Sequence, residues 1–188
     1  MRFLDEQQSH RSCMDLVGKC LVARPNIIDP FFKRSVVFIY EHSKGGTMGF
    51  VINKRKPDIM LRDLLNDRGF DTAQNDPVYN GGPVNPRAVC MVHSTGWQSS
   101  NTMIINDQIS VTSDDLMIYK FVNGDIPNGY KFCIGSAVWH PKQIVMELQA
   151  NHWLVTELSL HKIFDYDGRE LWDMAIEANA KETIDKFF

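Results

Sequence analysis

The sequence has no apolar run of the roughly 20 residues that a membrane-spanning helix needs. Its first residues, MRFLDEQQSHRS, are polar and lack the apolar core of a signal peptide. We therefore expect a cytoplasmic protein that has no membrane partner.

Cysteine is scarce and lacks the spacing of a metal or redox motif. The four cysteines are Cys13, Cys20, Cys90 and Cys133, and no two of them form a C-x-x-C pair. Without a secretion signal, we expect reduced and mostly buried thiols. A metal site would have to gather His42, His93 and His140 from distant segments, without paired i, i+4 ligands. The sequence therefore predicts neither a metal site nor a cofactor.

Motifs for nucleophilic catalysis are also missing. The chain contains no G-x-S-x-G elbow, and Ser94 directly follows His93, so the two side chains point to opposite faces of a strand. Gly81 and Gly82 precede a proline, but no G-K-[ST] follows, which favours a structural turn over a phosphate loop. We assign no catalytic residue. Whether the protein is an enzyme stays open, with a non-catalytic role favoured.

Positive charge is too sparse for a broad nucleic-acid interface. Lysine and arginine number 20 against 23 acidic residues, and the formal net charge is −3. The one dense basic run, Lys54-Arg55-Lys56, is most simply a solvated strand end. No helix-turn-helix spacing is visible, so the sequence disfavours direct nucleic-acid binding.

A hairpin over 35–56 is the clearest structural signal. Two runs rich in β-branched and aromatic residues flank the turn sequence Ser43-Lys44-Gly45-Gly46. Counting from this turn predicts the pairs Glu41–Met48, His42–Thr47, Tyr40–Gly49, Ile39–Phe50 and Val36–Asn53. The same register predicts one core face, formed by Val37, Ile39, Met48, Phe50 and Ile52.

The remaining patterns predict one α+β domain with a mixed, mostly antiparallel sheet around this hairpin and helices flanking it. Further strands are predicted at 19–23, 77–79, 88–93, 130–138 and 153–156, with a second hairpin joining 102–105 to 108–111. Helices are predicted at 59–68 with Asp58 as the cap, 113–123, 141–150, 158–164 and 168–179. Residues 1–17 are a predicted polar lead-in, 18–180 the domain, and 181–188 a C-terminal tail.

The predicted helix at 141–150 carries two stripes. Ile144, Val145 and Leu148 form the expected core stripe, whereas Gln143, Glu147 and Asn151 recur at i, i+4 and i+8 on a polar one. A solvated face is the simplest interpretation of the polar stripe, with Asn151 as the C-cap.

Several segments together resemble the YqgE/AlgH family. They read GKCLVARP (18–25), DPFFKRSV (29–36), EH (41–42), GTMGFVIN (46–53), NGGPV (80–84) and NHWL (151–154). The resemblance runs from about Gly18 to Ala178. It implies a bacterial, cytoplasmic protein with one mixed α/β domain and no assigned reaction. One member is named for the regulation of alginate synthesis, so the resemblance also implies the label of transcriptional regulator.

The chain departs from this family pattern at two places. The family usually has a glycine before the tryptophan and G-x-G-Q after it, where residues 138–143 read VWHPKQ. Thr47 replaces the usual alanine. Because proline and larger side chains replace flexible positions, a family site at 138–143 would bind something different here, or nothing.

Two functional hypotheses follow. The first is a non-catalytic regulatory or adaptor protein that binds a protein partner or a small molecule. The alternative is a small-molecule or anion-binding protein, or an enzyme, because restrained polar loops often serve binding. Its candidate pocket residues are Arg24, Pro25, Asp29, Asn53, Gly81, Gly82 and Gln143, with Glu41 and His42 as secondary candidates.

Overall fold

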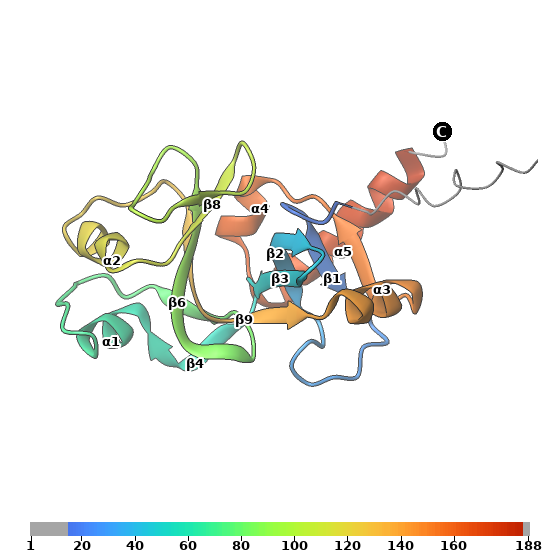
Figure 1. The fold of residues 1–188 in the computed structure, drawn as a ribbon, viewed down its shortest axis with the longest axis horizontal. Helices are drawn as coiled ribbons and strands as arrows, with labels where there is room; N and C mark the ends of the chain where they lie inside the picture. Colours follow the sequence, from blue (N-terminus) through green and yellow to red (C-terminus); the bar gives the residue numbers. More distant parts are fainter. Residues whose placement is uncertain (1–14, 186–188) are drawn as a thin grey trace, which may run out of the picture.

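Strand β9 (Tyr130–Trp139) lies at the centre of the structure and pairs with strands on both of its sides. The computed structural model describes residues 15–185 (Figure 1). The strand order is β10-β1-β2-β3-β9-β6-β8-β7; off this path β5 pairs with β9, and β4 pairs with β5. Nearly all pairs are antiparallel, whereas β5 runs parallel to β9. The predicted α+β class and mixed sheet are therefore confirmed.

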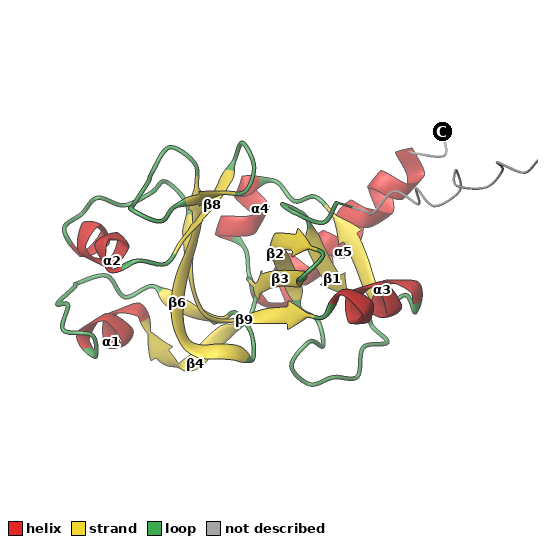
Figure 2. Ribbon diagram, viewed as in Figure 1, coloured by secondary structure: helices red, strands yellow, loops and turns green. Residues whose placement is uncertain are grey.

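The bounds of the other elements are as follows. The strands are β1 (Cys20–Ala23), β2 (Val36–Ser43), β3 (Gly46–Val51), β4 (Arg55–Met60), β5 (Pro77–Asn80), β6 (Val84–Ser94), β7 (Met103–Ile104), β8 (Ile109–Thr112) and β10 (Trp153–Thr156). The helices are α1 (Leu61–Asn66), α2 (Asp115–Val122), α3 (Pro141–Gln149), α4 (Leu160–Asp165) and α5 (Gly168–Asp185). Figure 2 shows α1 and α2 together on the left of the molecule and α3 and α5 together on the right.

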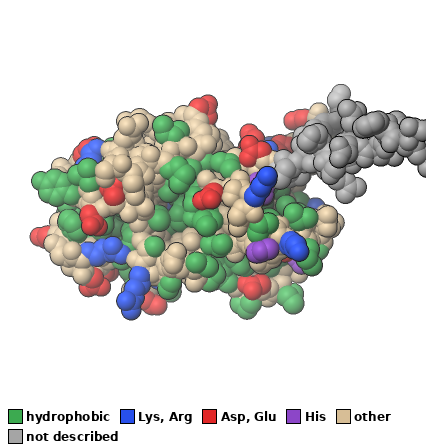
Figure 3. Space-filling model, viewed as in Figure 1, with side chains coloured by type: hydrophobic (Ala, Val, Ile, Leu, Met, Phe, Trp, Pro, Cys, Tyr) green, Lys and Arg blue, Asp and Glu red, His purple; other side chains and the backbone are tan. Residues whose placement is uncertain are grey.

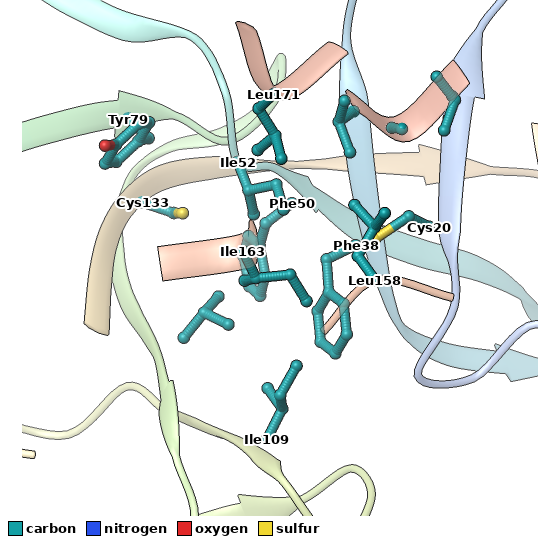
Figure 4. Close-up of a cluster of buried hydrophobic side chains, with 14 of the residues drawn as sticks. Cys20, Phe38, Phe50, Ile52, Tyr79, Ile109, Cys133, Leu158, Ile163 and Leu171 are labelled. Carbon is teal, nitrogen blue, oxygen red and sulfur yellow. The ribbon is translucent and has the colours of Figure 1, made fainter. Parts of the chain in front are cut away.

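Three groups of buried side chains hold the layers together. One lies between the sheet and helices α4 and α5, where Phe38, Phe50 and Leu171 meet (Figure 4). A second lies on the other face of β1, β2 and β3, against Ile144 of α3. The third packs α1 and α2 onto β5, β6 and β9. Because the hairpin separates the first two groups, both of its faces are buried.

The hairpin register differs from the prediction at one residue. Glu41–Met48 and His42–Thr47 pair as expected, but Ile39 pairs with Gly49 and Phe38 with Phe50. The register shifts between Ile39 and Glu41, which places the extra residue of a bulge at Tyr40. The predicted Tyr40–Gly49, Ile39–Phe50 and Val36–Asn53 pairs are therefore wrong, and the Ile52 amide donates to the Val36 carbonyl instead.

The predicted single core face of the hairpin is wrong for the same reason. Val37 and Ile39 face the α3 side, whereas Phe50 and Ile52 face the α5 side. A bulge reverses the alternation of side chains beyond it, and no sequence signal marked the bulge.

Helix α1 is shorter than predicted. Residues 55–60 form β4 instead, so the predicted cap Asp58 lies in a strand and Met60 precedes the helix. Helix α5 continues to Asp185, past the predicted start of the tail at 181. Val145 of α3 is 49% exposed and does not belong to the core stripe. Within residues 15–185, no helix is both long and apolar enough to cross a membrane.

Candidate functional site

The loop between β1 and β2 spans residues 24–35. Hydrogen bonds to the Asp29 side chain and from Lys54, which follows β3, hold it in place. Asp29 Oδ1 accepts hydrogen bonds from the amides of Phe31 (2.8 Å) and Phe32 (2.9 Å). The Lys54 ammonium donates to the Phe31 carbonyl. These contacts fix the turn that follows Asp29, and both amide hydrogen bonds use Oδ1 of its carboxylate.

Asn53 fixes the other end of the loop. Its side-chain oxygen accepts from the Val36 amide at 2.8 Å. Its amide group donates to the carbonyls of Arg34 (2.9 Å) and Gly168 (2.8 Å). Every hydrogen-bonding group of this buried side chain is therefore used to join the loop to the start of α5.

Helix α3 begins where the sequence predicted, at the segment that departs from the family pattern. His140 is the N-cap and Pro141 occupies the first turn. From this helix Glu147 extends toward two tryptophans: Oε2 accepts from Trp139 Nε1 at 3.0 Å and from Trp153 Nε1 at 2.7 Å. Gln143 Nε2 donates to Oε1 of the same carboxylate at 2.8 Å. Three N–H donors thus hold one carboxylate, which fixes α3 against β9 and β10.

A cleft of about 380 Å³ lies between this helix and the tip of the 24–35 loop. In Figure 1 the loop is the pale blue segment that hangs beside α3. Phe32 and Trp153 form an apolar floor, with ring centroids 5.5 Å apart in an edge-to-face arrangement. The lining residues are Asn26, Ile27, Ile28, Asp29, Phe32, Gln143, Glu147, His152 and Trp153.

The structure brings together only part of the predicted pocket. Asp29 and Gln143 both line the cleft, although 114 positions separate them in the sequence (143 − 29). Arg24 and Pro25 precede the loop tip and do not line the cleft. The Arg24 Nε atom is buried and has no hydrogen-bond partner among the described residues.

Gly81 and Gly82 do not reach the cleft either, because they pack directly on the backbone of β9. The Gly81 amide donates to the Ile134 carbonyl at 2.9 Å, and its carbonyl accepts from the Val51 amide at 2.9 Å. A Cβ on Gly82 would lie 1.9 Å from the Ser136 carbonyl carbon. This segment continues along β9 after β5 and forms no turn at Gly81 or Gly82, so the predicted tight turn is wrong.

The secondary candidates lie on the hairpin. Glu41 is exposed, and the His42 ring hydrogen-bonds Thr47 across the hairpin at 2.8 Å. The predicted pocket residues therefore lie in four separate places. Asp29 and Gln143 line the α3 cleft, Asn53 is buried beneath the loop, Gly81 and Gly82 contact β9, and Glu41 and His42 lie at the end of the hairpin.

Sequence reasoning missed a second, polar cleft of about 290 Å³ around Lys131. This side chain is only 2% exposed, and Nζ donates to the carbonyls of Ile52 (2.9 Å) and Tyr166 (2.6 Å). It lies 4.5 Å from the centroid of the Tyr79 ring, whose hydroxyl donates to Asp167 at 3.0 Å. Burial lowers the pKa of Lys131 to about 8. The signal in the sequence was the lysine inside the apolar run 130–138, because a charged residue in a buried strand often marks a polar site.

Comparison with known proteins places the chain in a family. The model of the AlgH-like family matches residues 20–183. The chain belongs to the AlgH-like family. A UPF0301 protein of Photobacterium profundum is 34% identical over 172 residues, covering 87% of this chain and 91% of that protein. A UPF0301 protein of Parabacteroides distasonis is 31% identical over 172 residues, covering 90% and 85%.

Two solved structures of similar proteins agree with this fold. The solution structure of the AlgH protein from Pseudomonas aeruginosa is 26% identical, with a TM-score of 0.76, and the match covers 89% of this chain and 90% of that one. A crystal structure from Corynebacterium diphtheriae, at 23% identity and a TM-score of 0.70, shares the fold and covers 84% of each chain. The family assignment made from the sequence is confirmed.

Proposed function

We propose that this AlgH-like protein is a non-catalytic regulatory or adaptor protein of the cytoplasm, and that the α3 cleft is its binding site. The observation that carries the proposal is the state of Glu147. Its two carboxylate oxygens are engaged by three N–H donors, so this group shapes the wall of the cleft and is not poised to abstract a proton.

The composition of the lining supports a binding role. The side chains that line the cleft include no serine, threonine, cysteine or lysine, so a nucleophile there would have to be Asp29, Glu147 or His152. At its edge, Ile28 is 92% exposed on a loop whose conformation is fixed. A rigid loop that presents an aliphatic side chain to solvent favours contact with another protein chain over enclosure of a small substrate.

The role of transcriptional regulator, named for the family, is compatible with this proposal through a protein partner. On the face drawn in Figure 3, lysine and arginine side chains lie scattered among acidic ones. Such a distribution favours protein contacts over a broad phosphate-binding surface.

The test is capture of partners by immobilised full-length protein and by an Ile28→Ser variant. We expect the variant to lose specific partners while its melting temperature stays unchanged, because Ile28 makes no core contact. Ile184→Ser is the control, since this isoleucine is 57% exposed on α5 and lies outside the cleft. Turnover of a metabolite that disappears in Gln143→Ala or Ile28→Ser would contradict the non-catalytic assignment.

A further inference from the structure

The charge of the α3 cleft restricts what can occupy it. Two carboxylates, Asp29 and Glu147, belong to the lining, and no lysine or arginine does. Lys54 interacts with Asp29 but is bound to the Phe31 carbonyl and lies outside the lining. Burial lowers the pKa of Lys54, and Asp29 opposes that shift. Anionic ligands are disfavoured here because the lining carries two carboxylates and neither lysine nor arginine.

Two acceptor atoms of the cleft are open among the described residues. Asp29 uses Oδ1 for the Phe31 and Phe32 amides, and Oδ2 receives no hydrogen bond. Gln143 donates through Nε2 to Glu147, and its Oε1 receives none. Both side chains are exposed, so both acceptors can receive donors from an occupant of the cleft.

The floor between these acceptors is aromatic. The rings of Phe32 and Trp153 line it, and Trp139 packs behind them, 5.6 Å from Phe32 and 5.7 Å from Trp153. A planar cation is attracted to aromatic rings and stacks on them, and a guanidinium offers five donors in one plane. A volume of about 380 Å³ is near the small end of ligand pockets, which span roughly 300–1,000 Å³, and suits a single side chain.

We propose that the α3 cleft binds an arginine side chain of a partner protein. The guanidinium donates to Asp29 Oδ2 and Gln143 Oε1 over the Phe32 and Trp153 rings, and Ile28 contacts apolar atoms next to that arginine in the partner chain. Arginine fits better than lysine because two separated acceptors match its fork of donors, and because its planar cation can stack on an aromatic ring. This inference rests on the proposed function and names the chemistry of the partner.

The experiment uses the full chain and a short peptide, acetyl-Gly-Ala-Arg-Ala-Gly-amide. Binding is followed through the NMR signal of the Trp153 indole N–H, which lies at the cleft wall. The matched control peptide carries citrulline in place of arginine, which has nearly the same shape but no charge. We expect a saturable shift with the arginine peptide and at least tenfold weaker binding of the citrulline peptide.

A variant of this protein tests the role of the Asp29 carboxylate. Asp29→Asn keeps an oxygen for the Phe31 and Phe32 amides, so the loop is retained, but it removes the charge; we expect at least tenfold weaker binding of the arginine peptide. Asp71→Asn, at an exposed position outside the cleft, should bind like the parent protein. Equal binding of both peptides, or binding that Asp29→Asn leaves unchanged, would overturn the inference. So would the absence of any shift.

These outcomes are separable from failure of the proposed function. If Ile28→Ser loses its captured partners while the arginine peptide does not bind, the cleft is an interface and the arginine assignment is wrong. If Ile28→Ser retains all partners and no peptide binds, both proposals are wrong.

Discussion

At the scale of single residues, the Glu147 carboxylate positions the side chains that form one wall of the α3 cleft. Its partners come from β9, β10 and the preceding turn of its own helix. Glu147→Gln replaces one carboxylate oxygen by an NH₂ group. Either the two tryptophan N–H groups or the Gln143 amide then loses its acceptor. We expect a loss of about 2 kcal/mol in the free energy of unfolding and a change in tryptophan fluorescence. Glu177→Gln, on the exposed side of α5, is the matched control in urea unfolding. Equal midpoints for the two variants would contradict this role.

His93 makes stability depend on pH. The buried ring donates from Nδ1 to the Ser94 carbonyl (2.9 Å), while Nε2 accepts from the Thr112 hydroxyl (2.9 Å). Burial lowers the pKa of His93 below its usual 6.5, with the hydrogen bond to Ser94 opposing the shift. The unfolded chain therefore binds a proton first, and stability falls as pH drops below about 6.5.

The measurement for His93 is the free energy of unfolding in urea at pH 8, 7, 6 and 5.5. One proton changes this free energy by at most about 1.4 kcal/mol per pH unit. His93→Gln should be less stable at pH 8 but should lose less on acidification. Parallel pH profiles for the two proteins would show that His93 titrates normally.

At the scale of elements, Asp114 joins helix α2 to the loop that precedes β7. Its carboxylate accepts from the Met117 amide (2.6 Å), the Ser99 hydroxyl (2.6 Å) and the Asn101 amide (2.8 Å). Partial burial alone would raise the pKa of Asp114, but these hydrogen bonds outweigh it and hold the pKa below its usual value. Asp114→Ala should lower the free energy of unfolding by about 1–2 kcal/mol. Asp115→Ala, one residue later and exposed, should change it little, and equal losses would exclude a specific cap.

Gly82, which follows β5, packs directly against the backbone of Ser136 and Ala137 in β9. An added Cβ would lie 1.9 Å from the Ser136 carbonyl carbon and 2.1 Å from the Ala137 amide nitrogen, so backbone would have to move. Gly82→Ala should give little soluble protein and no cooperative thermal transition. Gly45→Ala is the control, because its Cβ would meet only the Ser43 hydroxyl, at 3.4 Å. A folded Gly82→Ala protein would contradict this prediction, because it would show that the backbone at Gly82 and Ser136 can separate to admit a methyl group.

Local signals in the sequence were sufficient for most elements. The second hairpin, the capped start of α2 and the proline start of α3 all formed where turn and cap residues indicated them. Strand β4 was missed because its sequence, RKPDIM, is polar and contains proline, and only pairing with β5 makes it a strand. The bulge at Tyr40 shifts the hairpin register by one residue, and no local pattern in the sequence marks it.

At the scale of the molecule, the candidate site depends on pairings between distant segments. Ala23 pairs with Trp153, and Arg24 donates its amide to the His152 carbonyl, so the loop after β1 meets the turn before β10. The sequence predicted both Asp29 and Gln143 as site residues but grouped them with Asn53 and Gly82. Such grouping requires the strand order, which the chain's local patterns do not contain.

The buried thiols offer a test of whether the two halves of the sheet unfold together. Cys20 lies on β1 and Cys133 on β9, in one core, and burial raises the pKa of Cys20 to about 12 and that of Cys133 still further. The thiolate is the reactive form, so neither should react at pH 8 until the chain unfolds. Labelling with a thiol reagent, followed by peptide mass spectrometry, should give both cysteines one rate, which increases with urea in parallel with global unfolding. The half-buried Cys90 is the internal comparison and should react first. If Cys20 reacted faster than Cys133, the β1–β10 edge would open separately, and the cleft built on that edge would open with it.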